Sequence, residues 1–169
     1  MIVKLPFGRE TVAVDLRGLR VRPLLPSAPR GSGDLGRLLS RAVDFPIDGA
    51  SLSEIAKACR SAVIVVPDAT RRVDLPGVLP VVLNRLIAAG VPANSIEILV
   101  ACGTHAAVLP NEISDLIGKL PIGVSVRQHE SRDDAVLLSV GELRPGVALR
   151  LDRTAVETEL LITIGAVRH

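Results

Sequence analysis

The 169 residues suffice for one domain with a small appendage, and the net charge of +2, from 20 basic and 18 acidic residues, gives no sign of a nucleic-acid-binding surface. Apolar residues make up 48% and aromatic residues 1%, so the core is built from Val, Leu, Ile and Ala. Two cysteines form no disulfide framework, the first ten residues lack a signal-peptide core, and no apolar run has membrane-spanning length, which predicts a cytoplasmic protein without membrane contact.

The first 50 residues divide into an extended segment and a linker. Apolar and polar side chains alternate from Thr11 to Leu16, which predicts a short strand or hairpin within residues 1–20. Residues 22–34 are rich in Pro, Gly and Ser and predict a loop, and a short helix is expected over 35–42. We therefore expect residues 1–50 to form an amino-terminal β extension with a linker, separate from a domain of residues 51–169.

A regular alternation of strands and helices begins at residue 51. The expected elements are a helix over 51–60, a strand over 62–66, a helix over 75–90, a strand over 96–100, a helix over 110–118, a strand over 124–127, a hairpin of 136–140 with 147–151, and a strand over 160–164. This order indicates a parallel sheet with right-handed crossovers. The predicted fold is a Rossmann-like α/β layer sandwich with a mostly parallel sheet, truncated at its carboxyl terminus.

Polar residues gather where the predicted strands end. They are Asp68, Thr70, Arg71 and Arg72 after the first strand, Gly103, Thr104 and His105 after the second, His129 after the third, and Arg168 and His169 after the fourth. All three histidines of the chain are among them. Because ligands of such sheets bind outside the carboxyl ends of the strands, we expect these loops to form one site.

Each of these residues also has a purely structural explanation. Asp68 and Thr70 suit a side-chain turn that caps the next helix, and Arg71 suits a solvated charge. Gly103 suits a backbone turn and Thr104 a helix cap. His129 has Glu130, Asp133 and Asp134 nearby as possible hydrogen-bond partners. The set as a whole favours an anionic small molecule, because guanidinium groups and helix amino termini bind carboxylate and phosphate and a histidine can transfer a proton.

The motifs resemble those of the nickel-dependent lactate racemase family. Pro67-Asp68-Ala69-Thr70-Arg71 is similar to its Asp-x-Thr-Arg motif, and Gly103-Thr104-His105 to its Gly-Thr-His motif. Leu5-Pro6-Phe7-Gly8 resembles its usual opening, and Leu161–His169 the strand that leads into a Pro-His region. The resemblance covers nearly the whole chain in order. Departures are Arg72, Ala106 and Gln128-His129-Glu130, where the family more often has proline, arginine and a His-Asp pattern.

The resemblance implies a racemase or epimerase of small 2-hydroxy acids that uses a nickel-pincer nucleotide for hydride transfer. It implies that His105 and His169 are the catalytic histidines, with His105 acting as acid and base. It implies that Asp68, Thr70, Arg71, Gly103 and Thr104 bind substrate or cofactor, and that none of these residues binds the metal. The lysine that anchors the cofactor and the histidine that binds nickel are expected beyond residue 169, in a carboxyl-terminal domain of the same protein. The 169 residues alone are therefore expected to be inactive.

Two other functions stay open at this point. One is a non-catalytic nucleotide- or anion-binding module, in which the same loops bind an anion without chemistry. The other is a phosphoryl hydrolase that uses Asp68 with a divalent metal, but the predicted strand ends supply no convincing further carboxylates. No Gly-x-Gly-x-x-Gly or Walker A motif supports an ordinary dinucleotide or ATP site.

Overall fold

The structure is a computed structural model that describes residues 1–8, 10–22, 24, 33–71 and 73–166. Its contacts divide the chain into two compact units, Met1–Gly33 and Asp34–His169. In the first unit, β1 (Ile2–Phe7) pairs antiparallel with β2 (Glu10–Asp15), which confirms the expected amino-terminal hairpin. The expected linker lies largely outside the described residues.

Helix α1 (Leu35–Asp44) begins the second unit. The side chain of Asp34 caps it by accepting hydrogen bonds from the backbone N–H groups of Gly36 and Arg37. Asp44, at its end, accepts two hydrogen bonds of 2.7 Å each from the guanidinium of Arg85. This bidentate pair holds α1 against the next long helix, and α1 thus shares the compact unit that starts at Asp34. The expected domain boundary at residue 50 stays a prediction.

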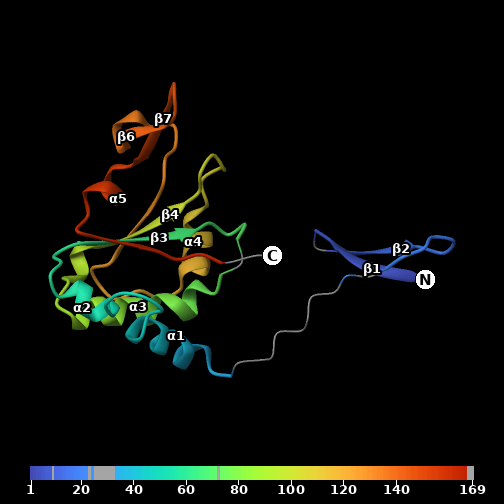
Figure 1. Ribbon diagram of the computed structural model, residues 1–169, viewed down its shortest axis with the longest axis horizontal. Coiled ribbons are helices and arrows are strands. Elements are labelled where there is room, and N and C mark those ends of the chain that lie inside the picture. The colour runs from blue at the N-terminus through green and yellow to red at the C-terminus, as the bar shows by residue number, and fades with distance from the viewer. Residues whose placement is uncertain (9, 23, 25–32, 72, 167–169) are drawn as a thin grey trace. The chain divides into compact units, whose positions relative to one another are not determined.

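A four-stranded parallel sheet organises the second unit. Its strands are β3 (Ala62–Pro67), β4 (Ile96–Ala101), β5 (Ser125–Gln128) and β8 (Leu160–Thr163), in the spatial order β5-β4-β3-β8. The chain runs outward from β3 through β4 to β5 and then returns to place β8 on the other side of β3 (Figure 1). The expected α/β class with a mostly parallel sheet is confirmed. Such a reversal of strand order is where ligands of open parallel sheets bind.

The core lies between the sheet and three helices, one before β3, one after β3 and one after β4. These helices are α2 (Leu52–Ala56), capped by Ser51 with Glu54 in a capping box, α3 (Leu75–Ala88) and α4 (Pro110–Ile117), with a 3-10 turn η1 (Ala93–Ser95) before β4. Leu79 and Leu83 of α3 are fully buried against Ile64 and Ile98 of the sheet. The opposite faces of these strands are also covered, because Val63 and Leu99 are 5% and 3% exposed. The continuous β-branched and leucine runs thus form the buried central strands that their sequence predicts.

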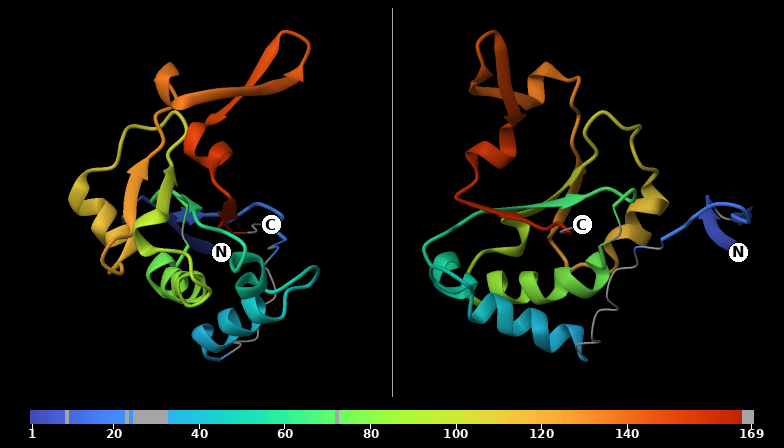
Figure 2. Two further views of the ribbon diagram at one scale, coloured as in Figure 1. Left: turned by 90° about the vertical axis from the view of Figure 1, so that its left-hand side faces the viewer. Right: turned by 45° about the vertical axis from the view of Figure 1, so that its right-hand side comes forward.

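A projecting hairpin connects β5 to β8 (Figures 1 and 2). After the 3-10 turn η2 (Asp134–Val136), β6 (Leu137–Arg144) pairs antiparallel with β7 (Val147–Asp152), and a short helix α5 (Arg153–Glu157) follows. The hairpin and α5 lie on the side of the sheet opposite α2 and α3. The hairpin confirms the sequence-based prediction, whereas α5 was not predicted. No helix within the described ranges combines the length and the apolar character needed to cross a bilayer.

Candidate functional site

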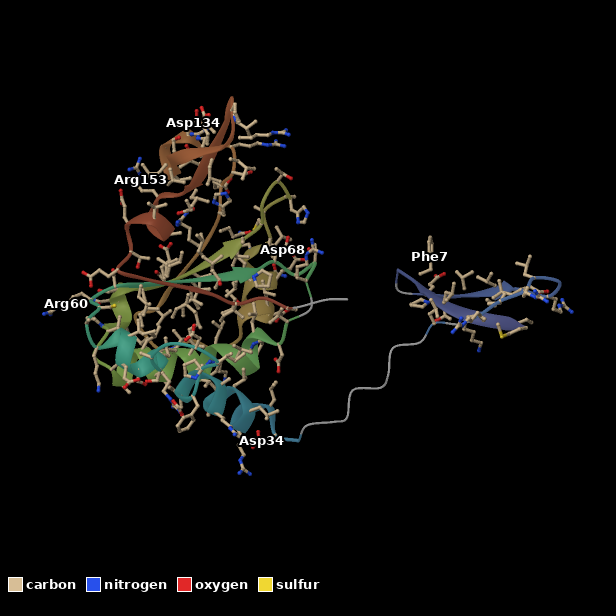
Figure 3. The ribbon with its side chains drawn as sticks, in the orientation of Figure 1. Phe7, Asp34, Arg60, Asp68, Asp134 and Arg153 are labelled. Atoms are coloured by element: carbon tan, nitrogen blue, oxygen red, sulfur yellow. The ribbon has the colours of Figure 1, made fainter. Side chains whose placement is uncertain are left out.

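The polar loops meet at the carboxyl edge of the sheet. Figure 3 labels Arg60 just before β3 and Asp68 just after it, at opposite edges. A cavity of about 450 Å³ opens at the Asp68 edge, between the ends of β3, β4 and β8. It is lined by six residues that the sequence predicts for the site, namely Asp68, Thr70, Arg71, Gly103, Thr104 and His105. The structure thus brings together the loops of both motifs.

Asp68 organises the first of these loops. Its Oδ1 accepts hydrogen bonds from the Thr70 backbone N–H at 3.0 Å and from the Thr70 hydroxyl at 2.5 Å. The backbone N–H of Arg71 donates to the Asp68 carbonyl at 3.1 Å, which completes a tight turn. The structural explanation is thus correct for the turn and wrong for the helix cap, because Asp74 caps α3 by accepting from Gly77.

The second oxygen of Asp68 contacts His105. The distance between Asp68 Oδ2 and His105 Nδ1 is 2.5 Å, and the Asp68 side chain is 7% exposed whereas that of His105 is 56% exposed. Burial raises the pKa of the Asp68 carboxyl, but the hydrogen bonds from Thr70 and His105 outweigh it, so the pKa lies below its usual value. A charged carboxylate at Nδ1 makes that nitrogen the donor and leaves Nε2 of His105 for a ligand.

A glycine-dependent turn carries His105. The His105 backbone N–H donates to the Cys102 carbonyl at 3.0 Å, and Gly103 has φ +58°, a conformation that side chains with a Cβ rarely adopt. Gly103 therefore serves the backbone, as its structural explanation states. Thr104 is not a helix cap, because Leu109 directly precedes α4 and its N–H donates to Glu112.

Gln128, which is not among the residues predicted for the site, fastens this loop to the sheet. At the end of β5, its side-chain oxygen accepts from the Val108 N–H at 2.6 Å and from the Cys102 thiol at 3.4 Å. Its amide nitrogen donates to the Val108 carbonyl at 2.8 Å. The side chain therefore holds both ends of the segment that contains His105. A polar residue at the end of a predicted strand, opposite the loop, is the sequence signal that points to it.

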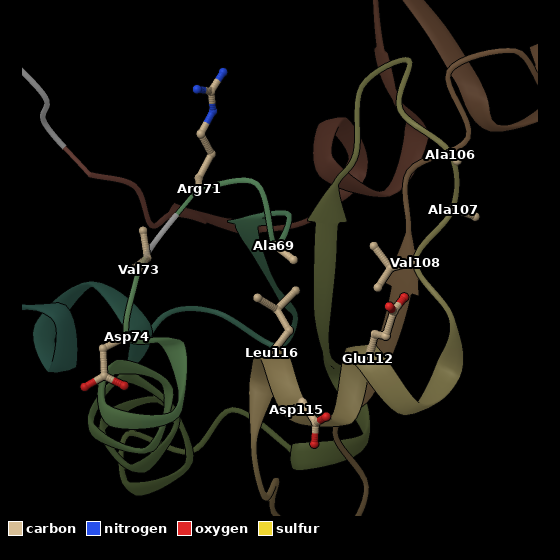
Figure 4. Close-up of a pocket in the computed structure, with 10 residues that line it drawn as sticks. All are labelled: Ala69, Arg71, Val73, Asp74, Ala106, Ala107, Val108, Glu112, Asp115 and Leu116. Carbon is tan, nitrogen blue, oxygen red and sulfur yellow. The ribbon is translucent and has the colours of Figure 1, made fainter. Parts of the chain in front are cut away.

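Arg71 is exposed and lines several cavities. Besides the 450 Å³ cavity it borders one of about 290 Å³ with Pro67 and Gly165, and one of about 720 Å³ with Val108, Glu112 and Leu116 (Figure 4). In Figure 4 its guanidinium extends away from the carboxylates of Asp74 and Asp115. Within the described part of the chain no carboxylate lies at ion-pair distance from it. The guanidinium is therefore available to an anion in these cavities.

Of the two remaining histidines predicted at strand ends, the structure describes only His129. His169 lies outside the described residues. His129 has a partner other than the expected Glu130, Asp133 and Asp134, since its Nδ1 lies 3.1 Å from Oδ2 of Asp152. That expectation was wrong because the end of β7 brings a buried carboxylate to the end of β5, a long-range contact that local sequence does not show.

No cluster of three or more His, Cys, Asp or Glu side chains in the described ranges is arranged to hold a metal ion. Burial, with the nearby Asp68 and Glu130 charges, raises the pKa of the Cys102 thiol, so this residue is no ready thiolate ligand. The carboxyl edge of the sheet supplies the imidazole of His105 with its Asp68 carboxylate, the guanidinium of Arg71 and the turn at Gly103. These groups suit a small anion that gives and takes a proton.

Fold and site together define an α/β domain with a cavity lined by polar loops at the carboxyl edge of a parallel sheet. A family model described as lactate racemase N-terminal domain matches residues 7–169. The chain therefore belongs to the lactate racemase family, of which it contains the amino-terminal domain.

Individual relatives agree with this assignment. The chain is 29% identical to a lactate racemase of Thermoanaerobacterium thermosaccharolyticum over 96% of its own length and 39% of the relative's. It is 30% identical to a lactate racemase of Lactiplantibacillus plantarum over 75% of its length and 30% of the relative's. It thus spans less than half the length of these curated relatives.

Solved structures are similar in fold. The lactate racemase apoprotein of Thermoanaerobacterium thermosaccharolyticum superposes with a TM-score of 0.81 at 27% identity, over 96% of this chain and 38% of that one. A protein of Thermotoga maritima superposes with a TM-score of 0.57 at 19% identity, over 76% of this chain and 31% of that one, and shows the fold alone.

Proposed function

We propose that this chain is the amino-terminal domain of a racemase or epimerase of small 2-hydroxy acids, in which His105 is the acid and base. The Asp68–His105 pair carries the proposal, because a buried carboxylate fixes the imidazole at the edge where both motifs meet. The membership in the lactate racemase family supports the reaction class. We propose this activity for a longer protein, since the chain covers only part of the length of its relatives.

The chain's own groups have distinct tasks in the proposed reaction. Arg71 binds the carboxylate of the hydroxy acid, since its guanidinium matches two carboxylate oxygens. His105 takes the proton of the C2 hydroxyl through Nε2 while the C2–H bond breaks with its electron pair, which leaves a 2-oxo acid. Return of the hydride to the opposite face of C2, and of the proton from His105 to the oxygen, gives the other enantiomer. Asp68 stabilises the imidazolium and keeps Nδ1 as its donor.

The proposed cofactor is a nickel-pincer nucleotide, which when bound supplies the acceptor for the hydride. The described residues fit such a group as one wall of its site: Arg71 and the Gly103–His105 turn face the 450 Å³ cavity and suit its anionic parts. They include no ligand cluster for the metal itself. The anchoring lysine and the nickel-binding histidine, together with the second catalytic histidine proposed at His169, are assigned to the segment around and beyond residue 169.

A deuterium label at C2 of lactate tests this function in the longer, cofactor-loaded protein. Hydride transfer keeps the deuterium at C2 in the product enantiomer, whereas removal of C2 hydrogen as a proton exchanges it with water. We expect racemisation with retained label, measured by chiral chromatography and mass spectrometry. Loss of the label to solvent contradicts the hydride mechanism, and absence of any racemisation favours the alternative of a non-catalytic nucleotide- or anion-binding module.

A further inference from the structure

Among the described residues only two charged side chains are buried, Asp68 and Asp152, and each of them contacts a histidine. Oδ2 of Asp152 lies 3.1 Å from Nδ1 of His129, just as Oδ2 of Asp68 contacts Nδ1 of His105. The His129 side chain is 19% exposed and that of Asp152 is 4% exposed. The fold thus contains a second imidazole that a buried carboxylate orients.

Hydrogen bonds from Arg127 and Thr154 fix the orientation of the Asp152 carboxylate. The guanidinium of Arg127 donates to both of its oxygens, at 3.0 and 2.7 Å, and Thr154 donates to it from its backbone N–H at 3.1 Å. Burial raises the pKa of the Asp152 carboxyl, but the hydrogen bonds from Arg127, His129 and Thr154 outweigh it and hold the pKa far below its usual value. The charged carboxylate accepts from Nδ1 of His129, which leaves Nε2 for another partner.

A cavity of about 320 Å³ adjoins His129. His129, Ser131 and Arg132 line one part of it, and the turn with Thr104 and His105 lines another. Asp68 and Arg71 are not part of its lining, although the Cys102–His105 turn borders both this cavity and the 450 Å³ cavity. The two cavities are therefore neighbours that share one loop.

The lining favours a small oxyanion. Arg132 is exposed, and no carboxylate within the described ranges lies at ion-pair distance from its guanidinium. Two imidazoles and the hydroxyls of Thr104 and Ser131 add further donors, against the single carboxylate of Glu130. Nε2 of His129 accepts from a hydroxyl when neutral and donates to an anionic oxygen when protonated.

We propose that this cavity is a second subsite for a small oxyanion, a carboxylate or a phosphate, bound by Arg132 and His129. Binding at this subsite is separate from the proposed racemase reaction, and it needs neither the cofactor nor a catalytic role for His105. A hydroxy acid and a phosphate group share the chemistry that these donors recognise. Titration with each ligand separately distinguishes the two sources.

The test is a titration of the 169-residue chain, with its histidine rings labelled with ¹⁵N, using lactate in one experiment and inorganic phosphate in another. The imidazole signals report on each site, and we expect the His129 ring to shift with millimolar affinity for at least one ligand. Arg132→Gln should weaken this binding severalfold. Arg144→Gln removes an equal charge near the tip of the hairpin and should leave it unchanged.

Two results would overturn the proposal. One is a His129 signal that neither ligand shifts at concentrations that shift His105. The other is a His129 response that Arg71→Gln abolishes and Arg132→Gln leaves intact, since it would mean a single site at Arg71. Because Arg132 is exposed, its replacement does not endanger folding, whereas His129→Gln serves as a second variant with melting temperature as its control. Loss of racemase function in the longer protein would leave this readout untouched.

Discussion

Nδ1 of His105 lies 2.5 Å from Oδ2 of Asp68, although 37 positions separate the two residues in the chain. The contact arises because β3 and β4 are parallel neighbours that end in register, with Pro67 opposite Ala101. A loop that leaves each strand at this edge needs only a few residues to reach the other. The pairing of strands therefore sets the geometry of the proposed acid–base group.

Replacement of His105 tests its proposed role directly. In the longer, cofactor-loaded protein, His105→Ala should lower turnover about 100-fold or more, because a positioned acid–base group contributes that much. Asp68→Asn should also lower turnover, since an amide oxygen stabilises the imidazolium less than a carboxylate does. Glu142→Gln on the hairpin is the control. Near-normal racemisation by the His105 variant would show a structural residue.

Arg71 is expected to bind the substrate carboxylate. Arg71→Lys keeps the charge but loses the bidentate geometry, so kcat/KM for lactate should fall, with much of the loss in KM. Steady-state kinetics on the longer protein measure this effect. Unchanged kinetics for both Arg71→Lys and Arg71→Ala would mean that the exposed guanidinium is only a solvated charge.

The isolated 169 residues should not racemise lactate, even with added nickel. The reason is that no three side chains of metal-ligand type converge in the described ranges, and the cofactor anchor is proposed to lie elsewhere. Chiral chromatography after incubation with nickel salts measures this. Enantiomer interconversion by the isolated chain would contradict the proposed division of the site.

The Asp152 network should make stability depend on pH in the acid range. The pKa of the Asp152 carboxyl is lowered in the folded state. The stability that this carboxylate contributes is therefore present above its pKa of about 3.9 in the unfolded state, and it is lost as the pH falls towards the pKa of the folded state. Asp152→Asn should cost about 2 kcal/mol of unfolding free energy at neutral pH, since it weakens charged hydrogen bonds in a buried position.

Thermal and urea denaturation followed by circular dichroism at several pH values check this dependence. The difference between the Asp152→Asn variant and the wild type should shrink as the pH falls below about 4. Asp134→Asn removes an exposed partner of Arg150 and should have little effect at any pH. A difference that stays constant across this range would exclude the charge of Asp152 as its cause.

Gln128 should control the order of the His105 loop. Gln128→Leu removes both hydrogen bonds to the Val108 backbone, so the Val108 amide should exchange with solvent faster. Gln128→Glu keeps only the acceptor, so its exchange rate should lie between those of the wild type and Gln128→Leu. Hydrogen exchange followed by NMR measures this. Ser125→Ala, which removes a side-chain hydrogen bond at the other end of β5, is the matched control. Equal exchange in all variants would contradict the role.

Local patterns predicted most of the fold. The buried runs at Ala62–Val66 and Ile96–Val100 and the leucine spacing of α3 carry their own periodicity, so sequence alone identifies them. Strand order was enough to predict that the loops with Asp68 and His105 lie at one edge of the sheet. It did not predict the hydrogen bond of Gln128 with Val108 or that of His129 with Asp152, because these are tertiary contacts between residues far apart in the sequence. Helix α5 has only five residues, too few for a periodic signal.

The place of β8 beside β3 has a consequence for folding. The strands β3, β4 and β5 pair with near neighbours in sequence, but Ala62 must find Leu160, and the Ile164 N–H must find the Val65 carbonyl, across a much longer stretch of chain. Closing so long a loop costs more entropy and is slower. We therefore expect β3, β4 and β5 to assemble early, with β8 docking late. The 450 Å³ cavity gains its wall at Thr163 and Ile164 only in that last step.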